Sequence, residues 1–217
     1  MRTKKASKTP KRGRRPSGEP SGKDALLHAA TASFAEFGFR RSDLRTIAKA
    51  AGVNASLALV CFGSKEGLWN ACVESVALQG RALIALLEQI ASGDGTVKER
   101  LTQVIFAGAK FNATHPEVRL FLTQSASEDL ARAERLVQEF VLPLYTTLLP
   151  LITAAIKAGV VKAKYPAPFF SILINSLSWQ KAVPALINRL APDIAPEDFA
   201  ELIASTAVSL FLHDPAK

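Results

Sequence analysis

The chain contains few of the residues that hold metals or form disulfides. Its 217 residues include two cysteines and three histidines. The three histidines lie far apart in the sequence. The spacing of Cys61 and Cys72 matches neither a metal site nor a disulfide framework, and this favours a reducing, cytoplasmic compartment. The sequence also lacks a Gly-rich phosphate loop and a nucleophile elbow. We therefore expect a protein that is not an enzyme and that needs no metal or cofactor.

Long apolar runs are scarce as well. The longest uncharged run, residues 140–156, is short for a membrane span and contains two prolines and several polar residues. The basic N-terminus is not followed by an apolar stretch, so it does not resemble a signal peptide. Apolar residues nevertheless make up 48% of the chain, which is ample for a buried core. We expect a cytoplasmic protein with no membrane partner.

The net positive charge of the chain comes from its first 23 residues. This segment holds nine of the 27 Lys and Arg residues but only one of the 19 acidic residues, so the rest of the chain is neutral. Its composition predicts a disordered basic tail over residues 1–20. Such tails bind polyphosphate by releasing counterions. Arg12, Arg14 and Arg15 stand between prolines, like an arm that enters the minor groove of A·T-rich DNA, and a solubilising tail is the alternative.

Apolar residues recur at helical spacing through nearly all of the remaining sequence, whereas strand signals are nearly absent. Helices are expected at residues 21–37, 65–90, 96–112, 116–125, 127–158, 167–190 and 196–212, with two short helices between residues 42 and 62. Thr96 and Glu99 form a capping box, and Pro143 and Pro150 should kink or interrupt the helix that contains them. The sequence predicts an all-α fold of about nine helices.

Residues 42–62 contain the two short helices, joined by a tight turn. Ser42 can cap the first helix, Gly52 permits a left-handed turn, and Asn54 can cap the second helix. Helix, glycine turn and short helix is the arrangement of a helix-turn-helix, whose second helix enters the major groove of DNA. An ordinary helical hairpin is the alternative.

The N-terminal sequence resembles the TetR family of one-component transcriptional regulators. The matching residues are Ala29, Phe34, Phe37, Gly38, Thr46-Ile47-Ala48, Ala51-Gly52-Val53, Leu57 and Phe62-Gly63-Ser64-Lys65-Glu66-Gly67-Leu68. The resemblance implies a DNA-binding domain over residues 21–66 and a ligand-binding and dimerisation domain over residues 67–217. It also implies a homodimer that binds a palindromic DNA operator as a repressor and releases it when a small-molecule effector binds.

The expected DNA contacts lie on the two short helices and just after them. They are Arg45, Thr46, Asn54, Ala55, Ser56, Leu59 and Lys65, together with the three tail arginines. Arg45 can contact phosphate or guanine, and Lys65 can clamp a phosphate with the free amides of a helix start; a solvated charge is the alternative for both. Family members usually carry Tyr and His where this chain has residues 59–61, Leu-Val-Cys. We expect this apolar helix to read thymine methyl groups, with the tail supplying affinity.

The C-terminal part is expected to bind a small, largely apolar effector between its helices. The candidate ligand contacts are Phe106, Phe111, Asn112, Phe121, Gln124, Phe140, Asn175 and Trp179, and a satisfied core group is the alternative for each polar one. The last two helices are apolar over more than one narrow face, which predicts a partner surface. The candidate dimer contacts are Phe169, Phe170, Leu173, Leu177, Phe199, Ile203 and Leu210.

Two other functions remain open at this stage. An all-α enzyme would need a convergent set of polar residues, and the sequence shows none. An architectural DNA-binding protein would use the basic tail alone and would bind all DNA sequences similarly. A regulator is preferred because it explains the tail, the helix-turn-helix and the helical remainder together.

Overall fold

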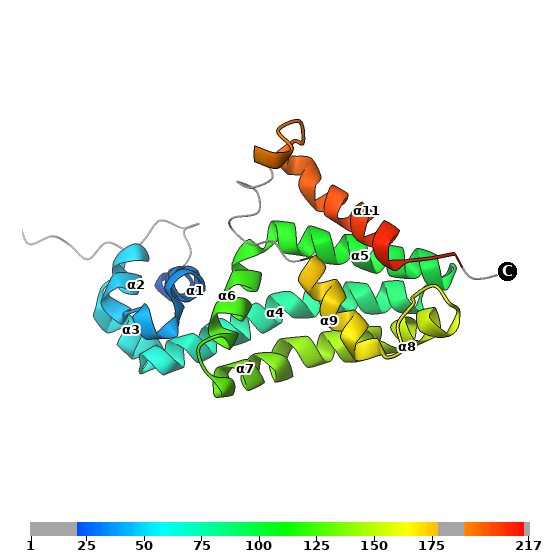
Figure 1. Ribbon diagram of the computed structural model, residues 1–217. Coiled ribbons are helices and arrows are strands. Elements are labelled where there is room, and N and C mark those ends of the chain that lie inside the picture. Colours follow the sequence, from blue (N-terminus) through cyan, green and yellow to red (C-terminus); the bar gives the residue numbers. More distant parts are fainter. Residues whose placement is uncertain (1–20, 178–188, 215–217) are drawn as a thin grey trace, which may run out of the picture.

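The computed structural model describes residues 21–177 and 189–214, and all regular secondary structure within these residues is helical (Figure 1). Helices α1 (Gly22–Arg41), α2 (Leu44–Ala50) and α3 (Ala55–Phe62) form a small N-terminal unit, residues 22–62, which we call the head. The long helix α4 (Lys65–Ser92) runs from the head into a larger helical bundle (Figure 1). The prediction of an all-α fold is confirmed.

The bundle, which we call the body, comprises the described residues after α4. Its elements are α5 (Val97–Thr114), α6 (Pro116–Ala126), α7 (Leu130–Leu136), a π-helical turn (Val137–Val141), α8 (Leu142–Lys157), α9 (Pro166–Ser176), a 3₁₀ turn (Pro196–Asp198) and α11 (Phe199–Phe211). Helix α6 leads from α5 across to α7 and lies beside the head (Figure 1).

Local sequence signals determine where several helices begin. The capping box is present, because Thr96 Oγ1 accepts a hydrogen bond from the N–H of Glu99, whose carboxylate accepts one from the N–H of Thr96 at 2.7 Å. Pro116 occupies the first turn of α6, where backbone N–H groups have no acceptor within the helix, so the N–H that proline lacks is not needed. Ser64 caps α4 through a hydrogen bond of 2.9 Å from the N–H of Gly67.

The long helix expected over residues 127–158 is divided. Helix α7 ends at Leu136, and the π-helical turn precedes Pro143. Because proline has no N–H and its ring collides with the carbonyl four residues earlier, a wider turn at this point accommodates it. Pro150 instead lies inside α8, which continues to Lys157. The effect found at Pro143 is therefore a local π-helical turn within a helical stretch that continues from Leu130 to Lys157.

Buried residues form two clusters, and α4 contributes to both. The head cluster combines Leu26, Phe34 and Ile47 of the head with Trp69 and Val73 of α4, and it extends to α6. The body cluster contains Leu83 and Leu87 near the other end of α4. The first turns of α4 thus belong to the core of the head, and this helix carries one continuous apolar side through both units.

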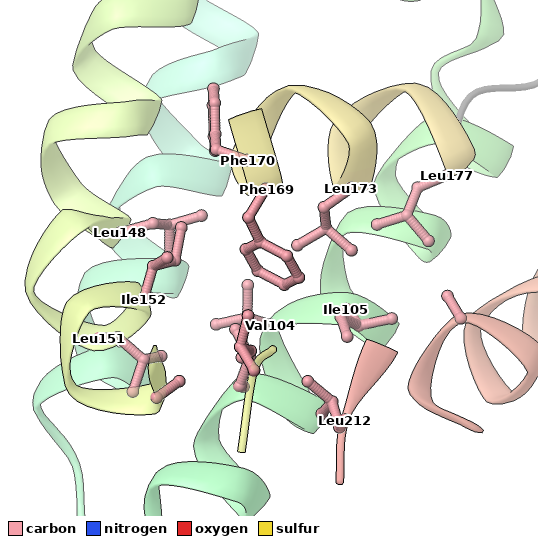
Figure 2. Packing of buried hydrophobic residues seen from close by; sticks show 14 of the residues in the cluster. Val104, Ile105, Leu148, Leu151, Ile152, Phe169, Phe170, Leu173, Leu177 and Leu212 are labelled. Carbon is pink, nitrogen blue, oxygen red and sulfur yellow. The ribbon is translucent and has the colours of Figure 1, made fainter. Parts of the chain in front are cut away.

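The body cluster corrects the prediction of the dimer interface. Figure 2 shows Phe169, Phe170 and Leu173 of α9, and Leu177 just after it, gathered with residues of α5 and α8. These four side chains and Phe199 are buried inside the chain's own core, so they are not available to a partner. Ile203 is half-buried, and only Leu210, with 65% of its surface exposed, faces solvent. The expectation that these residues exceed the needs of one core is therefore wrong for the five buried ones and stays a prediction for Ile203 and Leu210.

Two helical stretches, Lys65–Ser92 and Leu130–Lys157, are long and apolar enough by length and composition to cross a membrane. In this fold both contribute residues to the cores. Nine residues of α4 are buried, and α8 buries Leu148, Leu151, Ile152 and Ala155. Packing against other helices of the same chain therefore accounts for part of their apolar character.

Candidate DNA-binding surface and ligand cavity

The helix-turn-helix predicted from residues 42–62 is present. The chain turns through 108° between α2 and α3. Gly52, in the turn, has a φ of 66°, a left-handed conformation that favours glycine. Asn54 caps α3 as predicted, because its side-chain oxygen accepts a hydrogen bond of 3.0 Å from the N–H of Ser56. An angle of this size is typical of the motif whose second helix enters the major groove.

The cap of α2 is Asp43 and not Ser42, which corrects the prediction. Asp43 Oδ1 accepts hydrogen bonds from the N–H groups of Arg45 and Thr46, at 3.0 and 2.9 Å. The Thr46 hydroxyl donates to the other oxygen at 2.6 Å. These bonds, first that from the Thr46 hydroxyl, hold the pKa of Asp43 below its ordinary value. The hydroxyl of Thr46 is thus already engaged by a carboxylate, which disfavours its predicted contact with phosphate.

Helix α3 presents one face to solvent. At 100° per residue, Ser56, Leu59 and Val60 share this face, and the opposite face buries Ala58. Ala55, a predicted DNA contact, is half-buried at the edge of this face and packs against the head cluster. Leu59 is 51% exposed and Val60 82% exposed. Val60 was not among the predicted contacts, although its position four residues after Ser56 places it on the same face. The exposed face of α3 is largely apolar, which fits contact with thymine methyl groups better than contact with phosphate.

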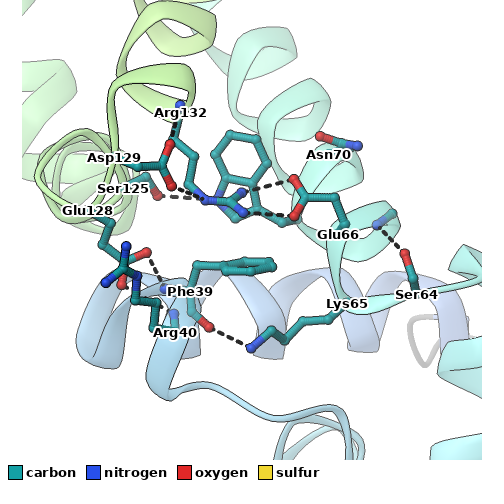
Figure 3. A network of polar contacts seen from close by, with 12 residues as sticks. Phe39, Arg40, Ser64, Lys65, Glu66, Asn70, Ser125, Glu128, Asp129 and Arg132 are labelled. Atoms are coloured by element: carbon teal, nitrogen blue, oxygen red, sulfur yellow. Dashed lines mark hydrogen bonds and ion pairs between the residues drawn. The ribbon is translucent and has the colours of Figure 1, made fainter.

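Two of the predicted cations occupy different surroundings. The side chain of Arg45 is exposed at the start of α2. In contrast, Lys65 Nζ donates a hydrogen bond of 2.8 Å to the carbonyl of Phe39 (Figure 3). It also donates to the carbonyl of Ser42 at 2.9 Å and lies 4.4 Å from the centre of the Phe39 ring. Two of its three donors are used within the head, so the structure disfavours Lys65 as a phosphate clamp. Arg12, Arg14 and Arg15 lie outside the described residues.

Polar contacts join the head to the body where α1 ends. The carboxylate of Glu128, in the loop after α6, accepts hydrogen bonds from the N–H groups of Phe39 and Arg40 (Figure 3). Gly38 precedes them with φ 78° and ψ 171°, and a Cβ at this position would collide with the Glu128 carboxylate and lie 2.9 Å from Gln124 Nε2. Gln124 thus lies at this junction, which corrects its prediction as a ligand contact.

Arg132 of α7 completes the junction. Its guanidinium forms hydrogen bonds of 3.0 and 2.7 Å with the two carboxylate oxygens of Glu66. It also lies 3.6 Å from the centre of the Phe39 ring and 4.4 Å from that of Trp69 (Figure 3). A planar guanidinium can form a two-pronged ion pair and stack on rings at the same time. The sequence did not reveal this network, because its members are up to 93 residues apart in positions that share no motif.

The body contains a cavity of about 480 Å³ between α4, α5, α6, α7, α8 and α9. Its walls are mainly apolar, formed by Leu83, Leu87, Val104, Phe111, Val118, Leu122, Leu136, Val137, Phe140, Val141, Leu144, Leu148 and Ile174. Four predicted ligand contacts line it, namely Phe111, Asn112, Phe140 and Asn175. A mainly apolar cavity of this size with a few polar groups is typical of small-molecule sites.

The other predicted ligand contacts do not line this cavity. Phe121 is fully buried in the head cluster, 6.5 Å from the ring of Phe34 and 6.1 Å from that of Trp69. Phe106 lines a separate, more open groove between α4, α5 and α11. Trp179 lies outside the described residues. Phe121 was assigned wrongly because helix α6 has two buried faces, one toward the head and one toward the cavity, and the sequence pattern does not distinguish them.

The polar groups of the cavity include one that sequence reasoning missed. Arg119 of α6 lines the cavity, and its Nη2 donates a hydrogen bond of 2.8 Å to Asn175 Oδ1. Burial lowers the pKa of Arg119 from its ordinary value, because desolvation disfavours the charged form. Asn112 Nδ2 donates to the carbonyl of Leu177 at 2.9 Å. In the described part of the chain, no group of three or more His, Cys, Asp or Glu side chains could hold a metal ion.

Comparison with known proteins identifies the head and the fold. Residues 26–72 match the family model described as bacterial regulatory proteins, tetR family. Among solved structures, HlyIIR, a hemolysin II transcriptional regulator, has a TM-score of 0.61 and 18% identity over 89% of this chain and 98% of that chain. The fatty acid degradation regulator FadR from Bacillus halodurans has a TM-score of 0.59 and 14% identity, over 88% of this chain and 95% of that chain.

A third solved structure, a transcriptional regulator of the TetR/AcrR family from Thermobifida fusca YX-ER1, has a TM-score of 0.54 and 16% identity. The match covers 86% of this chain and 96% of that chain. No match was found among curated proteins. At these identities the solved structures establish the fold of the chain.

Proposed function

Because the N-terminal domain of this chain belongs to the tetR family of bacterial regulatory proteins, and the chain has the fold of that family's regulators, we propose that it is a ligand-responsive transcriptional repressor. It acts in the cytoplasm as a homodimer on a palindromic DNA operator and is released by a small, largely apolar effector. The observation that carries this proposal is the geometry of α2 and α3, which turn through 108° and leave one face of α3 exposed.

The exposed face of α3 is the proposed reading surface. Leu59 and Val60 contact thymine methyl groups in the major groove, and Ser56 and Asn54 lie at the end of the same face. The neighbouring Arg45 contacts phosphate or guanine. Since this face carries no charge of its own, the basic N-terminal segment supplies much of the affinity through counterion release.

The cavity is the proposed effector site. Val118, Leu122 and Leu136 line the cavity and also belong to the head cluster, so one set of side chains touches both the effector site and the core of the head. The junction with the head is formed by Glu128, in the loop between α6 and α7, and by Arg132 of α7. These two helices also line the cavity. An effector that moves α6 or α7 therefore changes the position of the head, and the operator is released.

The dimer interface is proposed on the exposed apolar residues of α9 and α11 in place of the buried ones. Ile172 of α9 and Leu202 and Leu210 of α11 are exposed. Two copies of such a surface related by a two-fold axis bury these side chains, and the same axis imposes a palindromic operator.

Selection of bound sequences from a random DNA pool tests the proposal. We expect a palindrome whose half-sites bind more weakly when Val60→Ala or Arg45→Ala is introduced. A lost bidentate contact between Arg45 and guanine costs about 1–3 kcal/mol. Arg81→Ala, an exposed change on α4, is the matched control and should bind as the wild type does. Uniform affinity for all sequences, unaffected by the α2 and α3 variants, would instead support an architectural DNA-binding protein.

A further inference from the structure

Charge is scarce among the described residues that line the cavity. Among the described residues that line it, Arg119 is the only one with a formal charge, and the others are apolar or neutral. The guanidinium has five N–H donors, and the one hydrogen bond that the structure records for it is the bond to the neutral amide of Asn175. Residues 178–188, which the structure does not describe, include no Asp or Glu.

The neighbouring polar groups leave this cation uncompensated. Asn175 donates its own Nδ2 to the carbonyl of Ser171 at 2.8 Å, so its side chain is fixed as an acceptor for Arg119. Asn112 is likewise fixed by its bond to the carbonyl of Leu177. Thr123, one helical turn after Arg119 on α6, lines the same cavity and adds a hydroxyl. The site thus combines one cation with neutral hydrogen-bonding groups on an otherwise apolar wall.

A partly buried cation without a counter-ion is costly, since it has lost part of its hydration. A carboxylate placed against the guanidinium restores that loss through charge-assisted hydrogen bonds, often two in parallel. A neutral ligand of the same shape leaves the cation uncompensated and displaces its remaining water. The apolar walls, in contrast, gain from burial of a hydrocarbon chain or ring.

We propose that the effector is an amphiphilic anion, with a carboxylate that pairs with Arg119 and an apolar part that fills the space between α4, α6 and α8. This inference rests on the proposed function of the cavity and narrows the predicted class of effector from largely apolar to apolar with one negative charge. One cation matches one monoanionic group. The apolar part contacts Leu83, Leu144 and Leu148, which line the cavity with Arg119.

Three ligands with the same hydrocarbon chain test the charge. Decanoate, 1-decanol and decylammonium are titrated into the full-length protein at neutral pH, and their dissociation constants are measured by calorimetry. We expect decanoate to bind about 10- to 100-fold more tightly than decanol, as for other hydrogen bonds to charged groups, and decylammonium to bind most weakly. Arg119→Gln should remove the preference for decanoate while decanol still binds, which shows that the variant is folded.

Arg81→Gln, which removes an exposed positive charge outside the cavity, is the control and should keep the preference. Equal binding of decanoate and decanol to the wild type, or a preference that survives in Arg119→Gln, overturns the inference. Failure of all three ligands to bind overturns it as well. The proposed function is tested separately by operator selection, which needs no ligand. If the protein selects a palindromic operator but binds decanol as tightly as decanoate, only the proposed negative charge of the effector is overturned.

Discussion

The carboxylate of Glu128 accepts a hydrogen bond of 2.8 Å from the backbone N–H of Phe39, so a residue of the body holds the end of the first helix of the head (Figure 3). Its other oxygen accepts from the N–H of Arg40 at 3.2 Å. Both amides follow Gly38, where the helical geometry of α1 is lost. The position of the head is therefore fixed by a side chain from the loop that follows α6.

Replacement of Glu128 by Gln should weaken this junction. The amide keeps one acceptor oxygen but loses the charge and presents an N–H₂ group to a backbone N–H. We expect a loss of about 1–3 kcal/mol in the free energy of unfolding, measured by urea denaturation. Glu134→Gln, an exposed change on α7, removes the same charge and should have little effect. Equal stability of the two variants would show that the Glu128 contact contributes nothing.

Gly38→Ala should destabilise the protein through two causes. Its φ of 78° and ψ of 171° belong to a region that is essentially restricted to glycine, at a cost of about 1–3 kcal/mol for another residue. The added Cβ also collides with Glu128. Because the collision disappears in a Glu128→Ala background, Gly38→Ala should cost less there, and a double-mutant cycle measures the difference. Strict additivity would contradict the contact.

Arg132→Lys should not behave as a conservative change. Lysine keeps the charge but loses the two-pronged pair with Glu66 and the planar stacking on Phe39 and Trp69. We expect the unfolding free energy to fall by about 1–3 kcal/mol, mostly from the stacking of a guanidinium that is largely shielded from solvent. Arg81→Lys on the surface of α4 should be neutral in the same thermal or urea assay, and an equally small effect at Arg132 would refute the assignment.

Removal of residues 1–20 should weaken operator binding strongly. The segment carries eight Lys and Arg residues, and each phosphate contact that is lost reduces the slope of log affinity against log salt by about 0.9. Fluorescence anisotropy at several salt concentrations measures both effects. A variant with these cations replaced by Gln at unchanged length separates charge from length. Unchanged affinity and slope would show that the head binds without the tail.

The two cysteines should differ in reactivity. Burial raises the pKa of the Cys72 thiol to about 12, so its reactive thiolate is scarce at pH 8, whereas Cys61 on α3 is half-buried. A disulfide reagent at pH 8 should therefore label Cys61 first and reach Cys72 only after unfolding. Cys61→Ser should remove the rapid phase of labelling and is the control. Rapid labelling of both thiols in the native protein would contradict the structure.

Local signals made the helices predictable. Asn54 and Thr96 cap helices as expected because a cap involves residues within three positions of one another. Helical spacing places residues 59 and 60 on the same side of α3 as Ser56, but only the structure shows that this side is exposed. The cap of α2 was misassigned by one residue, because Ser42 and Asp43 are both good caps and only the fold buries the hydroxyl of Ser42 against the carbonyl of Gly38.

Partners far apart in the sequence could not be predicted in this way. Helical spacing identifies which residues share a face, but it does not say what covers that face. Phe169 and Leu173 were therefore expected at a dimer interface and lie in the chain's own core, and Phe121 was expected in the cavity and packs against the head. Gln124 was likewise expected to bind ligand and lies beside Gly38.

The sequence by itself determined the all-α fold and the helix-turn-helix, because helical periodicity, capping and a glycine turn act within a few residues. Only the tertiary structure decided which apolar faces meet one another, that Glu128 and Arg132 hold the head, and that Arg119 is the one charged group among the described walls of the cavity. These relationships depend on contacts between helices that are distant along the chain, and no local pattern of residues specifies them.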